Sequence, residues 1–353
     1  MSFDNKEGDQ MATMKDIARE ASVSVATVSM VLNNKPNSRI SKHKREEIER
    51  LARKLNYQPN FAAISLSKQQ SLNIALIVPD ITNPFFSLLT KEIDLSLEKD
   101  GYSTIFVDSN NSFQNEKKAI ESMVSRGVDG IILVPSNEFF RVDQAQRKQL
   151  IANLDKPFIL LNAYPNDLDV SYVNFDNVNG AYIATQELID KGHREIAFIQ
   201  GQTGFVNAAE RLAGYQQALR DHHLAIKPQN LFMGDYSVQS GYELASTITQ
   251  RKDITAILSS NDLMLFGMIK WAKMHHIDVL HQYAMIGFDN DPYSEILEVP
   301  LTSVDQRPKA MIEEALAILL ERIGNDHPVN KHALIKPELI KRASVFAPVP
   351  TSE

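Results

Sequence analysis

Beyond residue 72 the chain alternates short apolar runs with stretches of helical spacing. Apolar runs joined by helices are typical of buried parallel strands with right-handed crossovers. Eight such runs are too many for one simple doubly wound unit, so the pattern predicts an α/β body of two similar lobes, with a crossover near Val173 and a return near Leu301. The expected bounds are about 73–172 and 304–332 for lobe 1, and about 173–303 and 333–347 for lobe 2. The runs read NIALIVPD, YSTIFVDSN, GIILVPS, KPFILLNAY, EIAFIQGQ, NLFMGDYS, ITAILSSND and YAMIGFDND.

The segment 13–58 has helical spacing instead and predicts an all-α module. In DIAREAS, one helical stripe carries Ile17, Ala18 and Ala21. The following VS forms a turn in which Ser24 is placed to cap the next helix. Two short helices around such a turn predict a helix-turn-helix, although structural αα-hairpins share this pattern.

The helix that starts at Val25 has two different faces. On a helical wheel Val28, Val31 and Leu32 share the core side. The opposite side is small and uncharged, unlike a face that charge keeps in solution. Such a face suits a helix in the DNA major groove, where hydroxyls reach phosphates or base edges and apolar groups meet thymine methyls. Its residues are Val25, Ala26, Ser29, Met30 and Asn33.

A third helix and a short neck complete the amino-terminal region. Ser41 is placed to cap an amphipathic helix whose apolar positions are Ile48, Leu51, Ala52 and Leu55. The segment 59–72 then reads as a hinge helix and linker that is too short to be stable alone, so its order must come from binding. Residues 1–12 are expected to form a disordered tail.

Charge separates the two regions. Between Thr13 and Leu72 the chain has eleven Lys or Arg and five Asp or Glu, a balance of +6, whereas the whole chain carries −7. The remainder therefore carries −13. A basic head on an acidic body favours a polyanionic partner for the head alone.

These motifs resemble the lac-repressor/purine-repressor (LacI/GalR) family, in MKDIAREASVSVATVSMVLN, in LNYQPNFAAISLS and in the order of the apolar runs. The resemblance extends from about Met14 to about Ser344. It implies a helix-turn-helix headpiece, a hinge helix that folds on operator DNA, and a Rossmann-like effector domain of the periplasmic-binding-protein type. It also implies that a Leu from each subunit wedges into the minor groove at a central CG step, and Leu66 stands at that position.

The DNA-contact set that the resemblance implies contains two departures from the family. Met30 stands where a basic or hydrogen-bonding residue is usual, and Ile64 stands where Arg or Gln is common. Met30 cannot make a bidentate contact to guanine, so a thymine methyl or no base at all is its expected contact. Ser22 occupies a turn position that is often Gly. The full set is Ser24, Val25, Ala26, Thr27, Ser29, Met30, Asn33, Tyr57, Asn60, Ala63 and Leu66.

Polar residues gather where the predicted strands end, and in open α/β sheets ligands bind beyond those ends. The resemblance implies that Arg211, Asn261 and Asp289 contact the effector and that the segment from Asn83 to Phe86 lines the other lobe. Carboxylates and amides suit sugar hydroxyls, Arg forks across two of them, and an aromatic ring covers the apolar ring face. Asp and Asn at strand ends also cap helices, and this role stays open for the set. The candidate effector residues are Asn83, Phe85, Phe86, Asp108, Asn162, Asp176, Arg211, Asn261 and Asp289.

Other functions lack motifs. The absence of cysteine excludes disulfides and thiolate chemistry, and the chain has no phosphate-binding P-loop and no nucleophile elbow. Two adjacent histidine pairs, at His222 and His275, lack zinc-ligand spacing. No cofactor, metal or enzymatic activity is expected. Without a secretory signal or an apolar run of membrane length, a cytoplasmic protein is expected.

We therefore expect a homodimeric repressor of carbohydrate-utilisation genes that binds a pseudo-palindromic operator. A sugar or sugar phosphate in the inter-lobe cleft would control its operator affinity. Three alternatives stay open: a purine- or phosphoprotein-corepressed regulator of the same family, a solute-binding protein, and a sugar-modifying enzyme.

Overall fold

The computed structural model describes residues 12–32, 40–57, 70–164, 167–202, 205–325 and 329–348. The chain divides into two compact units, Met1–Ser71 and Leu72–Glu353, and each unit has an apolar core of its own. None of the helices in the described part of the chain has the length and apolar character that a membrane span requires.

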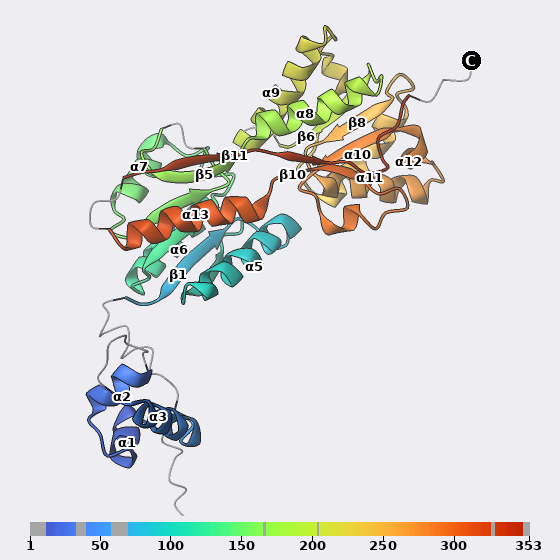
Figure 1. Cartoon of the computed structure of the whole chain (residues 1–353). Helices are drawn as coiled ribbons and strands as arrows, with labels where there is room; N and C mark the ends of the chain where they lie inside the picture. Colours follow the sequence, from blue (N-terminus) through green and yellow to red (C-terminus); the bar gives the residue numbers. More distant parts are fainter. Residues whose placement is uncertain are drawn as a thin grey trace, which may run out of the picture. The chain divides into compact units, whose positions relative to one another are not determined.

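The first unit is a module of three described helices (Figure 1). Ile17 on the first helix, Val28 and Val31 on the second, and Ile48 on the third are buried in one apolar cluster. The core side that the helical wheel assigns to the second helix is therefore confirmed. The helices are α1 (Met14–Glu20), α2 (Val25–Leu32) and α3 (Lys42–Lys54).

Local hydrogen bonds fix the starts of α1 and α2. The backbone nitrogen and the hydroxyl of Thr13 donate to Asp16 Oδ2 at 2.9 and 2.6 Å. At the start of α2 the backbone nitrogen of Thr27 donates to Ser24 Oγ at 3.1 Å, so the predicted Ser24 cap is confirmed. Ser22, in the turn between the helices, has a φ of +52°, in the left-handed region that favours glycine.

The described part of the second unit contains two six-stranded sheets, one in each lobe (Figure 1). The lobe 1 sheet has the order β11-β5-β4-β3-β1-β2 and is parallel throughout. The lobe 2 sheet has the order β12-β10-β9-β8-β6-β7, and only β12, within the described residues, runs antiparallel to its neighbour. The strands are β1 (Asn73–Val78), β2 (Ser103–Asp108), β3 (Gly130–Leu133), β4 (Phe158–Leu161), β5 (Ser171–Phe175), β6 (Ile196–Gln200), β7 (Leu231–Met233), β8 (Ala256–Ser259), β9 (Ala284–Phe288), β10 (Thr302–Asp305), β11 (His332–Ile335) and β12 (Glu338–Ile340).

Helices cover both faces of each sheet, because successive strand residues point to opposite faces. In β1, Leu76 shares a core with α5 and α13, whereas Ile77 shares a core with α6 and α7. In lobe 2, α8 and α9 cover one face of the sheet, and α10 and α11 cover the other. The helices are α5 (Pro84–Lys99), α6 (Phe113–Ser125), α7 (Gln144–Ala152), α8 (Asn177–Asp190), α9 (Val206–Asp221), α10 (Val238–Thr249), α11 (Asp262–Met274), α12 (Val279–Gln282) and α13 (Pro308–Ile323), with 3-10 turns η1 (Pro228–Asn230) and η2 (Pro292–Ser294).

Four strands, β5, β10, β11 and β12, are absent from the predicted set of eight. They are short, and they either carry polar residues such as Asn174 and Ser303 or lie partly exposed at a sheet edge. The expected lobe bounds at 172, 303 and 332 consequently fall inside β5, β10 and β11. The chain passes between lobes only after each of these strands is complete, because each pairs with one sheet.

Two glycines bring α10 and α11 together. A Cβ on Gly241 would lie 1.9 Å from the carbonyl oxygen of Met264, and a Cβ on Gly267 would lie 1.9 Å from that of Val238. Both distances are far inside van der Waals contact, so a larger residue at either position forces the helices apart. This close approach fixes α11, whose first residue is the buried Asp262.

We expect Gly267→Ala to lower the free energy of unfolding by about 1–3 kcal/mol, because the new methyl group must displace the α10 backbone. Gly324→Ala is the matched control, since the nearest heavy atom to its Cβ would be 3.8 Å away. We expect the control to leave stability unchanged or raise it by up to about 1 kcal/mol. Urea unfolding followed by Trp271 fluorescence measures both changes, and equal losses would contradict the packing argument.

Candidate functional site

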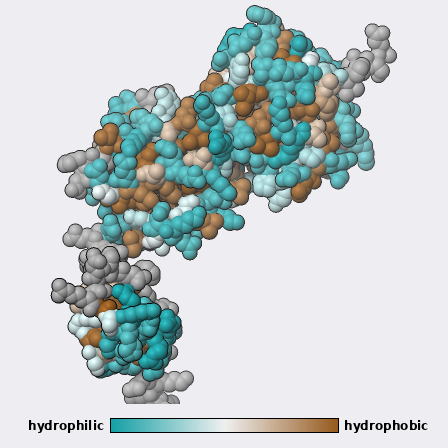
Figure 2. All heavy atoms as spheres, viewed as in Figure 1, coloured by the Kyte–Doolittle hydropathy of each residue, from teal (hydrophilic) through white to brown (hydrophobic). Residues whose placement is uncertain are grey.

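The outward face of α2 is the candidate DNA-reading surface. Val25 is 41% exposed, Ala26 is exposed, and Ser29 and Met30 are half-buried. None of the four carries a charge, although the surrounding sequence has a charge excess of +6. The surface of this unit is mainly hydrophilic on the face that Figure 2 shows. An uncharged helix face in a basic unit fits base-edge contacts flanked by phosphate contacts.

Three of the other predicted DNA contacts, Ser24, Thr27 and Tyr57, lie within the described residues. The hydroxyl oxygens of Ser24 and Thr27 lie 2.9 Å apart at the start of α2, where Ser24 also caps the helix. Tyr57 packs partly against the core of the module. The predicted contacts that lie outside the described residues are Asn33, Asn60, Ala63 and Leu66.

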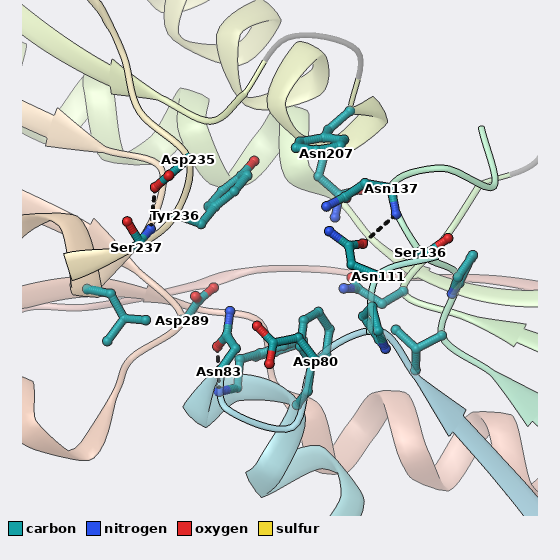
Figure 3. Close-up of a pocket in the computed structure, with 18 of the residues that line it drawn as sticks. Asp80, Asn83, Asn111, Ser136, Asn137, Asn207, Asp235, Tyr236, Ser237 and Asp289 are labelled. Carbon is teal, nitrogen blue, oxygen red and sulfur yellow. Dashed lines mark hydrogen bonds between the residues drawn. The ribbon is translucent and has the colours of Figure 1, made fainter. Parts of the chain in front are cut away.

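A cavity of about 390 Å³ lies between the lobes, where the strands of both sheets end (Figure 3). Side chains from the two lobes point into the same space. A two-sided polar and aromatic lining of this size fits a small-molecule site. The lining contains six of the nine predicted effector residues: Asn83, Phe85, Phe86, Asn162, Arg211 and Asp289.

Arg211 lies at the lobe 2 side of the cleft and is only 3% exposed. Its Nε donates to Asn177 Oδ1 at 2.9 Å, and its Nη1 donates to the carbonyl oxygen of Ser260. The guanidinium carbon lies 4.1 Å from the centre of the Phe288 ring. Nη1 is also 4.0 Å from Asp289 Oδ1, so the cation and the carboxylate compensate each other.

Asp289 follows β9 in a left-handed conformation, with a φ of +91°. Its Oδ1 accepts a hydrogen bond from the side-chain amide of Gln306, which follows β10. Burial raises the pKa of Asp289, although the charge of Arg211 and the Gln306 hydrogen bond oppose the shift. The carboxylate therefore joins the ends of two neighbouring strands at the cleft.

Asn83 and the two phenylalanines belong to the start of α5, on the lobe 1 side. Asn83 Oδ1 caps the helix by accepting from the backbone nitrogen of Phe85 at 3.0 Å, which leaves the amide nitrogen pointing into the cavity (Figure 3). Phe85 and Phe86 meet edge to face, with ring centres 5.3 Å apart. Asn162 follows β4 with a φ of +57° and is 9% exposed.

Comparison with known proteins identifies both units. Residues 13–60 match the family described as bacterial regulatory proteins, lacI family, and residues 185–345 match the periplasmic binding protein-like domain. The HTH-type transcriptional repressor CytR of Escherichia coli (strain K12) is 31% identical over 346 residues, which cover 97% of this chain and 98% of that protein. The chain belongs to the lacI family of bacterial regulatory proteins.

Other relatives of this lacI-family chain agree with that assignment. The HTH-type transcriptional repressor PurR of Histophilus somni (strain 2336) is 29% identical, over 95% of this chain and 99% of that protein. The transcriptional regulator CelR in complex with cellobiose superposes with a TM-score of 0.69 at 26% identity, covering 94% and 99% of the two chains. The lac repressor dimer bound to operator and the anti-inducer ONPF shares the fold, with a TM-score of 0.82 at 24% identity, over 96% and 100% of the chains.

Three predicted effector residues of the lacI-family chain lie outside the cavity lining. Asp108 binds a backbone nitrogen of the loop after β1 at 3.0 Å, and Asp176 caps α8 at 3.0 Å. Asn261 caps α11 at 3.1 Å and donates to the carbonyl oxygen of Tyr236 at 2.8 Å. Asp176 and Asn261 therefore perform the capping role that the sequence left open, whereas Asp108 holds the loop after β1 and caps no helix.

Several lining residues were missed from the sequence, although the strand-end signal applied to them as well. They follow β1, β2, β3, β7 and β10, and the last of these strands was itself not predicted. The missed polar residues include Asp80, Asn111, Asn137, Asp235, Tyr236 and Gln306.

Among the described residues no cluster of three His, Asp or Glu side chains is arranged to hold a metal ion.

The buried Asp262 carboxylate anchors the loop that carries Asp289. It accepts hydrogen bonds from the backbone nitrogen of Asp291 and from the hydroxyls of Ser294 and Ser303, each at 2.8 Å. Burial and the neighbouring charge of Asp289 raise the pKa of Asp262 to about 8, although these hydrogen bonds oppose the shift. The cleft wall in lobe 2 thus depends on a carboxylate that does not line the cavity itself.

Glu116 supports the opposite wall in the same way. It is fully buried on α6, and its Oε1 accepts from the backbone nitrogen of Ser136, which lines the cleft. Its Oε2 has no hydrogen-bond partner among the described residues. Burial raises the pKa of Glu116 to about 7, although the Ser136 hydrogen bonds oppose the shift.

We expect the folding stability of this lacI-family chain to fall as pH rises from about 4.5 to 7, because folded Glu116 binds its proton more tightly than unfolded Glu116. The rise of the pKa of Glu116 from 4.5 to about 7 corresponds to a loss of about 3 kcal/mol in the free energy of unfolding. Glu116→Gln removes the contribution of Glu116 and should make that part of the profile less steep, while Asp262, with its pKa raised to about 8, still contributes over the same range. Glu121→Gln, an exposed change on the same helix, should leave it unchanged. Unfolding in urea at several pH values measures the slopes, and identical slopes in all three proteins would refute the assignment.

Proposed function

We propose that this lacI-family protein is a transcriptional repressor that binds a pseudo-palindromic operator as a homodimer. A small molecule in the inter-lobe cleft sets its operator affinity. The uncharged, exposed face of α2 in a basic unit carries the proposal, since a polyanion partner explains the charge and base contacts explain the neutral face. CytR and PurR, which match nearly the whole chain, are repressors by name.

Exposed apolar side chains on lobe 1 support the homodimer. Leu88 and Leu95 are seven residues apart on α5, so they share a face of the helix, and they are 41% and 43% exposed. Phe106 is 39% exposed on β2, the edge strand beside α5. Neighbouring apolar side chains that remain in solvent mark protein contacts. The lac repressor structure is likewise a dimer on its operator.

The effector is proposed to be a sugar or sugar phosphate, and the regulated genes to serve carbohydrate utilisation. The cleft offers amides, carboxylates, a guanidinium and aromatic rings, and the related CelR is a cellobiose complex. A purine or phosphoprotein corepressor is the alternative within the family. Operator and effector affect each other's affinity reciprocally, whichever sign the coupling has.

We propose no catalytic activity for the cleft. The related CytR and PurR are transcriptional repressors by name, which supports a regulatory role. The match of residues 13–60 to the lacI family of regulatory proteins also argues against a solute-binding protein, which needs no such unit. A repressor acts where the chromosome is, so we propose a cytoplasmic protein.

The proposed function is tested by selecting binding sites from random DNA and measuring the selected site against competitor DNA in gel shifts. We expect specific binding about 1,000-fold or more tighter than binding to the competitor. The selected sites should be pseudo-palindromic. An absence of sequence preference at every salt concentration would contradict the repressor assignment.

A second prediction concerns how α2 reads bases. If Met30 contacts a thymine methyl, replacing that thymine by uracil should weaken operator binding about fourfold, which corresponds to one buried methyl group of ~0.8 kcal/mol. Met30→Ala should abolish this sensitivity. Met274→Ala, at a 62% exposed position on α11, is the control and should keep the sensitivity. Uracil scanning of the selected operator gives the answer, and equal sensitivity in all three proteins would exclude the Met30 contact.

A further inference from the structure

Three carboxylates face the cleft from both lobes. Asp80 follows β1, Asp235 follows β7 and Asp289 follows β9, and all three surround the same space in Figure 3. The nitrogen and hydroxyl of Thr82 donate to Asp80 Oδ1 at 2.8 and 2.6 Å. The nitrogen of Ser237 donates to Asp235 Oδ1 at 2.9 Å. Burial alone would raise the pKa of Asp235, but the hydrogen bonds from Ser237 and Ser240 lower it below its usual value.

Among the described residues, Arg211 is the one cation in the lining, and its contacts are already made within lobe 2. Its guanidinium compensates Asp289, so the charges of Asp80 and Asp235 have no counterpart in the lining. Arg141 is not part of the described lining, but its guanidinium lies 5.0 Å from the centre of the ring of Phe205, which does line the cavity. The residues of the second unit outside the described ranges include no Lys or Arg.

Helix starts do not reverse this balance. Side chains of the protein itself cap α5, α10 and α11 at the cleft, through Asn83, Ser237 and Asn261. α9 begins beside the cavity without a side-chain cap. A neutral cap satisfies only one of the free backbone N–H groups, so all four helix starts add partial positive charge, but a helix dipole carries no net charge. The formal charge of the described lining therefore stays at −2, from three aspartates and one arginine.

Buried acceptors in the lining are also unpaired. Asn162 Oδ1 and Gln306 Oε1 have no hydrogen-bond partner among the described residues, and these side chains are only 9% and 2% exposed. The amide nitrogen of Gln306 is already used on Asp289. Tyr236 Oη is buried without a described partner as well. These three atoms have almost no surface exposed to the cavity, so a ligand could reach them only after the lining shifts, and selection of the ligand rests on the exposed carboxylates.

We infer that the cleft selects an uncharged or cationic ligand rich in hydrogen-bond donors, a polyhydroxylated or amino compound without phosphate or carboxylate groups. This inference rests on the proposed function and narrows its ligand class. Hydroxyl or amino groups of the ligand donate to the carboxylates of Asp80 and Asp235. A phosphate at the same place meets like charges.

Matched pairs of probes test this charge selectivity by calorimetry on the full chain. The pairs are glucose and glucose 6-phosphate, ribose and ribose 5-phosphate, and adenosine and its monophosphate, with glucosamine as the cationic probe. We expect at least one unphosphorylated probe to bind, and its phosphorylated partner to bind about tenfold more weakly or worse. A phosphorylated probe that binds as tightly as its parent overturns the inference. Failure of every unphosphorylated probe also overturns it, because each carries the donors that the cleft requires.

Charge-removing variants locate the selectivity. Asp80→Asn and Asp235→Asn should each reduce the difference in affinity between the two probes of a pair. Either the unphosphorylated probe binds more weakly or the phosphorylated probe binds more tightly. Glu243→Gln is the matched control, since it removes an exposed carboxylate of lobe 2 that does not line the cleft. An equal difference in affinity in the unchanged protein and in all three variants would show that these carboxylates do not set the selectivity.

Gel shifts on the same preparations separate this inference from the proposed function. A protein that prefers its operator but binds phosphorylated probes overturns the inference alone. A protein without operator preference overturns the repressor assignment, while calorimetry still decides the charge class of the ligand.

Discussion

Burial of the Arg211 guanidinium is the constraint on which the geometry of the cleft depends. A buried cation costs several kcal/mol unless it is paired and hydrogen-bonded, as an order of magnitude. Compensation comes from Asn177 at the start of α8, Ser260 after β8, and Phe288 and Asp289 at the end of β9. A shift of any of these elements would leave a buried charge without its partners. The lobe 2 wall therefore holds its charges in place before a ligand arrives, which lowers the cost of binding.

The same residues connect the cleft to the boundary between the lobes. Phe288, under the Arg211 guanidinium, meets Phe175 of lobe 1 edge to face, with ring centres 6.2 Å apart. Both rings belong to one apolar cluster that continues from lobe 1 into lobe 2. A change in the angle between the lobes must repack this contact, and a ligand that touches Arg211 acts on the same ring. Packed side chains therefore join the proposed ligand site to the boundary between the lobes.

The sequence predicted the elements whose stability is local and apolar, and missed those that depend on partners distant in the chain. The run before Asn83 is an unbroken apolar strand, whereas β5 and β10 contain Asn174 and Ser303, whose polar side chains are tolerated only in the folded surroundings. Gln306 was not predicted because β10, the strand that it follows, was not predicted either. Asn261 looked like a ligand-binding residue, yet its amide satisfies a helix start and a carbonyl oxygen. A strand-end position predicts polarity, but it does not predict whether the side chain lines the cavity, as Asn83 does while it caps α5, or lies outside the lining, as Asn261 does.

Charge distribution gives one physical reason for the separation of the two functions. The segment 13–72 carries +6, and the rest of the chain carries −13. DNA therefore attracts the first unit and repels the second, so that an acidic body discourages non-specific contacts of the large lobes with the duplex. The lining of the cleft is acidic like the body around it, so its uncompensated carboxylates repel phosphates. A cleft of this charge is also protected from the phosphate-bearing metabolites that share its compartment, and it leaves phosphate recognition to the unit that reads DNA.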